Sequence, residues 1–178
     1  MKSLHTERLV LRGLTLEDAA RVEELAGDYQ VARTTLTIPH PYPEGSAKDF
    51  ITSITAAAEQ GKLVIYAITE KETENLIGII NISLNEPNQR GELAYWIGKP
   101  YWGKGYGTEA AERLIQLGFE NLNLNKIFAA SFTDNPGSWR IMEKVGMKHE
   151  GTLRQHVVKW GEPIDLSYYS ILKEEYNA

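Results

Sequence analysis

The alternation of hydrophobic and polar residues predicts a series of β-strands over much of the chain. Residues 8–14 alternate in this way, which is typical of a half-buried strand. Two runs rich in β-branched residues surround the polar turn at 71–75 and predict an antiparallel hairpin covered on both faces. Strands are therefore expected at 8–14, 62–70, 75–84, 91–98 and 126–132, followed by a closing antiparallel pair at 147–159 and 163–172 turned at 160–162.

Apolar residues at helical spacing predict helices between these strands. Thr15 is expected to cap the first helix and Ser46 the second, which should end at the glycine that follows it. Later helices are expected at 106–122 and 136–145. The stretch 28–45 is expected to be irregular, because "TIPHPYPEG" holds three prolines in five residues. The apolar face of the second helix is expected to hold Phe50, Ile51, Ile54, Ala57 and Ala58.

The order of elements between residues 91 and 132 predicts a crossover connection. A strand, a helix and a second strand follow one another there, so the strands at 91–98 and 126–132 should be parallel. No internal repeat or linker divides the chain, and residues 1–178 are expected to form a single domain of the mixed α/β class.

Composition limits the partners and locations that fit the chain. The 178 residues are 42% hydrophobic and 24% charged, as in ordinary globular proteins. The net charge of −5 argues against nucleic acid as a partner, although a small anionic ligand needs only local donors. No cysteine is present, which excludes a cysteine nucleophile and fits a reducing, cytoplasmic location. The charged N-terminal stretch is unlike a signal peptide, and no apolar run is long enough for a membrane span.

Three glycines alternate with other residues in the loop between the strand expected at 91–98 and the helix that follows it. They are Gly103, Gly105 and Gly107, with Lys104 between the first two. Backbone N–H groups left uncovered at a helix N-terminus bind anions, so we interpret the loop as a cradle for a pyrophosphate. The spacing matches neither the Walker pattern nor the dinucleotide fingerprint G-x-G-x-x-G. The alternative is a tight turn without a ligand.

The segment "ELAYWIGKPYWGKGYGTEAAERLIQLGFE" resembles the acetyl-coenzyme A binding motif of the GNAT N-acetyltransferases. The family's loop pattern, Arg/Gln-x-x-Gly-x-Gly/Ala, is matched at 102–107, except that Trp102 stands at the first position. A second segment, "NPGSWRIMEKVGMKHEGTLRQHV", looks like the RimJ/RimL branch, the ribosomal-protein N-terminal acetyltransferases and their relatives. "ERLVLRGLTLEDA" and "IPHPYP" fit that branch too, so the resemblance extends over nearly the whole chain.

This resemblance implies the GNAT fold, with a mostly antiparallel central sheet, a splayed parallel strand pair and helices on both faces. It implies acetyl-CoA as cosubstrate, with the pantetheine arm lying in the splay. No metal is expected, since the four histidines lack metal-ligand spacing. The residues that should contact acetyl-CoA are Trp102, Gly103, Lys104, Gly105, Tyr106, Gly107 and Thr108 in the loop, Tyr95, Trp96 and Ile97 along the arm, and Asn135 and Ser138.

The implied reaction is direct transfer of the acetyl group to a primary amine. The backbone amide of Tyr95 would hold the oxyanion, as the family places that donor on this strand. Ser138 would stabilise the leaving thiolate, because the position of the family's usual tyrosine holds Met142. The alternative for Ser138 is satisfaction of backbone groups near the helix start, and the alternative for Asn135 is an ordinary N-cap.

The sequence offers two candidates for the general base. Glu92 begins the strand that should flank the substrate, and matching carboxylates occur there in relatives. His156 is the other candidate, because an unperturbed histidine has a pKa of about 6.5. Either side chain could instead be structural, and a water relay without a base is a third alternative.

The acceptor is expected to be the α-amino group of a protein or peptide, as the RimJ/RimL resemblance implies. An α-amine has a pKa of ~7.7–8.0 against ~10.4 for lysine, so it needs less help from a base. Arg33, His40 and Tyr42 lie where relatives shape the acceptor pocket, with a rigid proline-stiffened loop as the alternative. Small amines (amino acids, polyamines, aminoglycosides) and a non-catalytic acyl-CoA-binding sensor are the alternative functions. A homodimer is left open.

Overall fold

The structure is a computed structural model that describes residues 2–177, and one eight-stranded sheet forms its centre. The strand order is β1-β2-β3-β4-β5-β6-β8-β7, and all neighbours are antiparallel except β5 and β6. The strands are β1 (Leu4–His5), β2 (Leu9–Arg12), β3 (Leu63–Glu70), β4 (Leu76–Asn85), β5 (Arg90–Ile97), β6 (Lys126–Phe132), β7 (Lys148–Lys159) and β8 (Glu162–Leu172).

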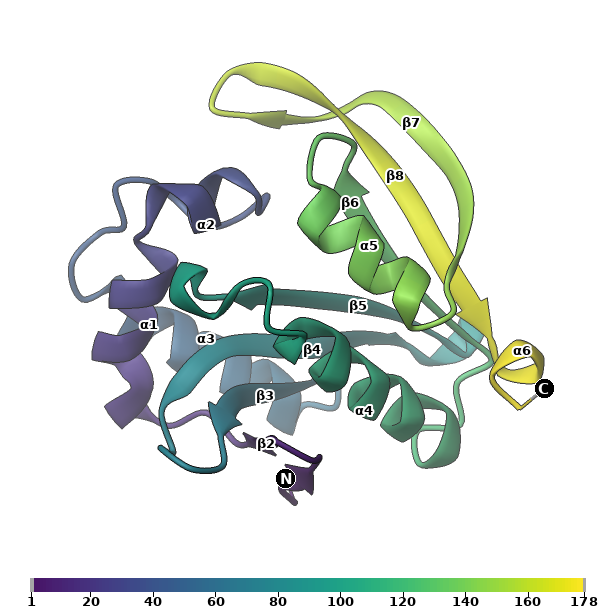
Figure 1. Cartoon of the computed structure of the whole chain (residues 1–178), viewed down its shortest axis with the longest axis horizontal. Coiled ribbons are helices and arrows are strands. Elements are labelled where there is room, and N and C mark those ends of the chain that lie inside the picture. Colours follow the sequence, from purple (N-terminus) through teal and green to yellow (C-terminus); the bar gives the residue numbers. More distant parts are fainter. Residues whose placement is uncertain (1, 178) are drawn as a thin grey trace.

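Helices cover both faces of this sheet. In Figure 1, α4 and α5 lie in front of the strands and α3 lies behind them. The α-helices are α1 (Ala19–Ala26), α2 (Tyr29–Arg33), α3 (Ser46–Glu59), α4 (Tyr106–Glu120), α5 (Pro136–Lys144) and α6 (Lys173–Tyr176), with short 3-10 segments at Leu16–Asp18, Glu86–Asn88 and Lys99–Tyr101. The expected mixed architecture, with its mostly antiparallel sheet and single parallel pair, is confirmed.

Two hydrophobic cores explain why β3 and β4 are apolar at odd and even positions. Ile68 and Ile80 belong to the core beneath α4 and α5. Ile65 and Ile79 belong to the core beneath α1 and α3. Successive side chains of a strand point to opposite faces, so a strand between two helical layers must be apolar on both.

The parallel pair β5–β6 is joined only at its beginning. Arg90–Glu92 pair with Lys126–Phe128, and the register of the two strands ends there within the described residues. The rest of β5 remains paired to β4 through Ile97, so only its other edge is open. The expected splay between these strands is thus present, and it places an unpaired strand edge beside the N-termini of α4 and α5.

The segment 28–45 is more regular than its prolines predict, because it begins with the short helix α2 (Tyr29–Arg33). Asp28 caps this helix by accepting a 2.7 Å hydrogen bond from the backbone N–H of Gln30. The prolines start only at Pro39, beyond the end of the helix, so they do not prevent its formation. The expectation of an irregular stretch was therefore wrong for its first third.

The start of α3 also differs from the expectation. Gly45, with φ of +78°, is the N-cap, and Ser46 is the first helical residue, whose hydroxyl donates to the carbonyl of Pro43 at 2.7 Å. The buried face of α3 includes Ile51, which is 1% exposed, whereas Phe50 is 37% exposed and lies outside the core. A single step along a helix turns a side chain by about 100°, which is enough to move it from core to solvent.

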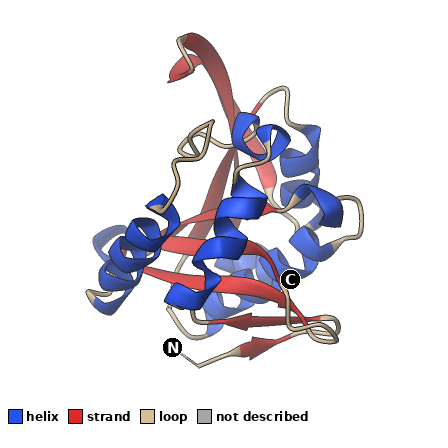
Figure 2. Cartoon of the chain, turned by 90° about the vertical axis from the view of Figure 1, so that its left-hand side faces the viewer, coloured by secondary structure: helices blue, strands red, loops and turns tan. Residues whose placement is uncertain are grey.

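The β7–β8 hairpin projects from the body of the molecule (Figure 2). Near its tip the buried Lys159 donates hydrogen bonds to the carbonyls of Leu36 (3.3 Å) and Ile38 (2.8 Å). The indole of Trp160 stacks on the ring of Tyr29 with centroids 5.6 Å apart. Burial lowers the pKa of Lys159. The hairpin tip is therefore tied to α2 and to the loop that follows it.

No helix within residues 2–177 is both long enough and apolar enough to cross a membrane.

Candidate active site

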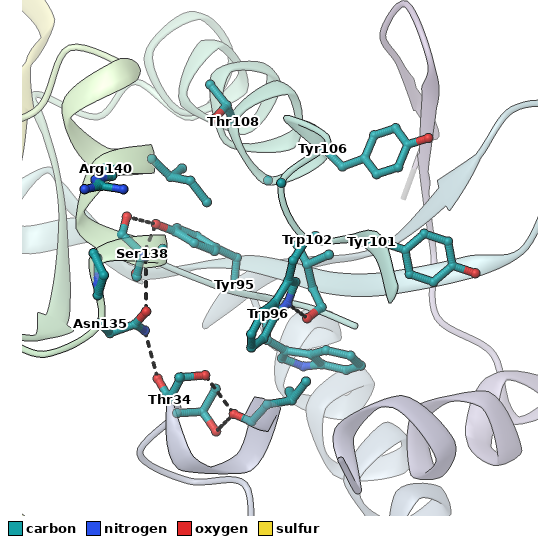
Figure 3. Close-up of a pocket in the computed structure, with 18 of the residues that line it drawn as sticks. Thr34, Tyr95, Trp96, Tyr101, Trp102, Tyr106, Thr108, Asn135, Ser138 and Arg140 are labelled. Carbon is teal, nitrogen blue, oxygen red and sulfur yellow. Dashed lines mark hydrogen bonds between the residues drawn. The ribbon is translucent and has the colours of Figure 1, made fainter. Parts of the chain in front are cut away.

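A cavity of about 470 Å³ opens at the splay between β5 and β6. The ends of α2, α4 and α5 surround it, and Figure 3 shows most of the residues that line it. The site residues expected from the sequence that line this cavity are Arg33, Tyr95, Trp96, Ile97, Trp102, Gly103, Gly105, Tyr106, Gly107, Thr108, Asn135 and Ser138. The lining also includes residues that were not expected: Val31, Thr34, Thr35, Tyr101, Asp134, Pro136, Gly137, Arg140, Ile141 and Lys144.

The open edge of β5 presents backbone polar groups to this cavity. Gly98 donates its N–H to the carbonyl of Ile77 at 2.8 Å, so Gly98 is hydrogen-bonded to β4. Along an antiparallel pair, every second residue is hydrogen-bonded to the partner strand. In that alternation the backbone groups of Tyr95 and Ile97 point away from β4. The carbonyl of Ile97 accepts a 2.6 Å hydrogen bond from the indole Nε1 of Trp102. The N–H of Tyr95 is thus directed at the splay, where the sequence analysis expected an oxyanion donor.

The glycine loop leads directly into α4. Gly103 and Gly105 have φ of +74° and +82°, the left-handed region that glycine enters without steric cost. Gly105 is the N-cap of α4, so the free N–H groups of the first helical turn lie beside the loop. Gly107 serves a different purpose, since a Cβ there would lie 2.7 Å from Cδ1 of Ile141 on α5. This helix N-terminus and its uncovered backbone suit an anionic group.

Arg8 and Glu109 brace the loop from outside the cavity. Arg8 donates from Nη1 to the carbonyl of Lys104 at 2.9 Å and from Nε to Glu109 at 2.7 Å. Its guanidinium also lies 4.7 Å from the ring centroid of Tyr106. Burial alone would raise the pKa of Glu109, but hydrogen bonds from Thr6 and Arg8 hold it below its ordinary value. Sequence reasoning missed this brace, because its two halves lie on different elements.

Tyr95 and Ser138 meet across the splay (Figure 3). The hydroxyl of Tyr95 donates to the backbone carbonyl of Ser138 at 2.9 Å and lies 3.3 Å from its Oγ. Burial raises the pKa of Tyr95 far above its ordinary value, so the phenol stays protonated. The pair places two hydroxyl groups at the middle of the cavity, where a thiolate or an oxyanion could receive a hydrogen bond.

Asn135 joins α5 to α2 (Figure 3). Its Oδ1 accepts from the backbone N–H of Ser138 at 3.3 Å, as an N-cap does. Its Nδ2 donates to the carbonyl of Thr34 at 3.3 Å. The neighbouring residues Arg33 and Asp134 form an ion pair across the same gap, with 3.8 Å between Nη2 and Oδ2. Asp134 could have been noticed in the sequence as a carboxylate at the end of a strand, next to the "NPGS" segment.

Several expected site residues lie outside this cavity. The side chain of Lys104 lies over the ring of Tyr101, 5.4 Å from its centroid. Glu92 is exposed on β5 opposite Ser83, and His156 lies in the irregular part of β7 with its ring 6.3 Å from that of Tyr168.

The two remaining residues that were expected to shape the acceptor pocket, His40 and Tyr42, make contacts elsewhere. The ring of His40 lies 5.2 Å from that of Tyr29 and 6.2 Å from that of Trp160. Tyr42 packs against the core beneath α1 and α3, and burial raises its pKa. In the part of the chain that the structure describes, no three His, Asp or Glu side chains gather in a way that could hold a metal ion.

Comparisons with known proteins agree with this fold. A family model described as "Acetyltransferase (GNAT) domain" matches residues 8–148. The Bacillus licheniformis protein p20, named an uncharacterized N-acetyltransferase, is 34% identical over 177 residues, which cover 99% of each chain. A crystal structure of a GNAT-family acetyltransferase from Bacillus anthracis has a TM-score of 0.87 at 26% identity, covering 97% of this chain and 99% of its own.

Other similar proteins carry names that differ in the acceptor. The Bacillus subtilis protein YdaF, provisionally named a ribosomal N-acetyltransferase, is 37% identical over 105 residues, which cover 58% of this chain and 57% of its own. A spermidine N(1)-acetyltransferase from Vibrio cholerae is 28% identical over 110 residues, or 61% of this chain and 64% of its own. The structure of RimL, a ribosomal L7/L12 α-N-protein acetyltransferase in complex with coenzyme A, shares the fold at 13% identity, with a TM-score of 0.88 and coverage of 96% and 98%.

Proposed function

The chain belongs to the GNAT family of acetyltransferases and is an acetyl-CoA-dependent N-acetyltransferase, and on that premise we propose that its acceptor is the α-amine of a peptide or protein. The observation that carries this proposal is the composition of the cavity. Neither Glu92 nor His156 lines it, so the two residues considered as a general base lie away from the place of transfer. An acceptor that is already partly neutral near pH 7 suits such a site.

The proposal includes an orientation of the coenzyme in the cavity. We place its pyrophosphate on the backbone amides from Gly103 to Thr108 at the start of α4 and its pantetheine arm along the open edge of β5. This placement is supported by the left-handed glycines of the loop and by the cationic side chains of Arg140 and Lys144 on the facing side of α5.

Transfer then proceeds directly between two bound substrates, without an acetylated enzyme. The amine nitrogen attacks the thioester carbonyl carbon, and the oxygen of that carbonyl becomes an oxyanion that the N–H of Tyr95 stabilises. The carbon–sulfur bond then breaks, the thiolate accepts a hydrogen bond from the hydroxyl of Ser138, and the amine proton passes to solvent. These roles are supported by the orientation of the β5 edge and by the 3.3 Å approach of Ser138 Oγ to the hydroxyl of Tyr95.

Placement of the chain in the RimJ/RimL branch is part of the proposal. The provisional name of YdaF points to a ribosomal protein, and the net charge of −5 suits a basic target. The named spermidine acetyltransferase among the relatives makes a small amine the second candidate.

A paired assay tests the proposal. One peptide is prepared with either its α-amine or its lysine side chain blocked, and release of free coenzyme A thiol is followed with each. We expect acetylation of the peptide whose α-amine is free. Preference for the peptide with only its lysine free would contradict the proposal, and activity on small amines alone would replace it with the second candidate.

A further inference from the structure

The cavity has two ends, separated by the pair Tyr95 and Ser138. Figure 3 shows Tyr106 and Thr108 of the glycine-loop end on one side of this pair, and the bond between Asn135 and Thr34 on the other. With the coenzyme entering from the glycine loop, the acceptor must approach from the second end. That end is formed by the C-terminal turn of α2 and by the loop between β6 and α5.

The charges of the lining are unevenly distributed. Among the lining residues in the described part of the chain, Asp134 is the single carboxylate, and the cationic side chains are Arg33, Arg140 and Lys144. Arg140 and Lys144 lie one helical turn apart on α5. Among the described residues, the one negative side chain of the lining therefore lies at the acceptor end, beside Asn135.

The ion pair at this end is longer than the other ion pairs of the described residues. Arg33 and Asp134 approach to only 3.8 Å, and their side chains are 42% and 70% exposed. The pair of Arg12 and Asp18 is at 2.7 Å, with the carboxylate almost buried. Charge-assisted hydrogen bonds in proteins have lengths of about 2.7–2.9 Å, so Asp134 is close to a cation without being fully engaged by it. An incoming ammonium group can take the place of Arg33 at little cost.

We propose that Asp134 binds the ammonium group of the acceptor in place of Arg33, and that the cavity thereby selects an amine with a single positive charge over a polyamine. This inference rests on the proposed function and deepens it. One carboxylate balances one ammonium group, whereas the further charges of a triamine would face Arg33 and would meet no second carboxylate among the described lining residues. The ammonium must leave the carboxylate and lose its proton before attack, and an α-amine, with a free pKa of ~7.7–8.0, loses it more readily than a lysine side chain does.

Two substitutions test the inference because they should act in opposite directions. Asp134→Asn removes the carboxylate and should raise KM for an α-amine peptide about three- to tenfold, with kcat changed less. Arg33→Gln removes the competing cation and should lower KM for the same peptide. If the ion pair of Arg33 and Asp134 only tethers α2 to the β6–α5 loop, both substitutions should raise KM. Asp134→Glu should restore part of the affinity, and Glu72→Gln in the exposed turn between β3 and β4 is the matched control.

Peptide binding to the enzyme–coenzyme A complex is also measured by calorimetry, so that the test does not depend on turnover. Peptide binding that weakens in Asp134→Asn and strengthens in Arg33→Gln supports the inference even if no acetyl transfer occurs, in which case the proposed function alone fails. The inference is overturned if the two variants have equal effects or if binding is unchanged in Asp134→Asn. It is also overturned if spermidine binds more tightly than the peptide, or if neither amine binds.

Discussion

The hydroxyl of Tyr95 donates a 2.9 Å hydrogen bond to the backbone carbonyl of Ser138, and this bond joins β5 to α5 beyond the point where β5 and β6 separate. Tyr95 lies on β5, and Ser138 lies in the first turn of the helix that follows β6. The backbone N–H of Ser138 is held by Asn135 at 3.3 Å. The backbone N–H and carbonyl of Ser138 therefore have hydrogen-bond partners that do not involve its hydroxyl. Its Oγ remains available to a ligand.

We therefore expect Ser138→Ala to lower kcat about ten- to hundredfold while the affinity for acetyl-CoA and the stability of the fold change little. The alanine keeps the backbone contacts to Asn135 and Tyr95 and loses only Oγ. Steady-state kinetics and thermal unfolding measure the two effects. Ser131→Ala is the control, because the hydroxyl of this β6 serine donates to the carbonyl of Phe132 and Ser131 does not line the cavity. An unchanged kcat with a large loss of stability would instead assign Ser138 a structural role.

Replacement of Gly105 by valine should weaken acetyl-CoA binding by tenfold or more. The φ of +82° at this position costs an L-residue about 1–2 kcal/mol, and its Cβ would lie 3.3 Å from Nη2 of Arg8, which braces the loop. Titration calorimetry measures the affinity. Gly45→Val is the matched control, because Gly45 has a φ of +78° with open space around it and lies at the start of α3. Equal binding by the wild type and Gly105→Val would show that the loop does not hold the coenzyme.

Glu109→Gln should destabilise the protein by about 1 kcal/mol at neutral pH, and the difference should vanish in acid. Hydrogen bonds from Thr6 and Arg8 outweigh the effect of burial and lower the pKa of Glu109 in the folded state. A carboxyl whose pKa is lowered on folding contributes its full stability above the unfolded value, about 4.3, and loses it as the pH falls through the folded pKa. Urea unfolding of both proteins at pH 7 and below pH 4 measures this. A difference that grows toward acid pH would contradict the sign of the shift.

Product-inhibition kinetics should show a ternary complex of enzyme, acetyl-CoA and amine. The chain has no cysteine, and in the proposed arrangement the acceptor and the coenzyme bind on either side of one transfer point in the cavity. A ping-pong pattern, or an acetylated enzyme isolated after incubation with acetyl-CoA alone, would require a covalent intermediate and would overturn direct transfer.

The amino-acid sequence by itself determined the features that depend on near neighbours. The double-sided apolar pattern of β3 and β4, the turn between them and the glycine loop before α4 all follow from residues a few positions apart. These features depend on strand periodicity and on the backbone freedom of glycine, both of which can be recognised without a tertiary contact. The GNAT family was recognised from the resemblance of two sequence segments, and most of the residues proposed to contact the coenzyme line the cavity.

Only the tertiary structure decided which side chains share the cavity. Thr34 and Asn135 are joined by a hydrogen bond across 101 residues of sequence, and the ion pair of Arg33 and Asp134 lies beside it. Glu92 and His156 belong to β5 and β7, yet they lie outside the cavity. The side to which a strand residue points depends on the register and divergence of the strands and on irregularities such as Gln155, with φ of +50°. These properties arise from the packing of the whole sheet, so no local pattern could specify them.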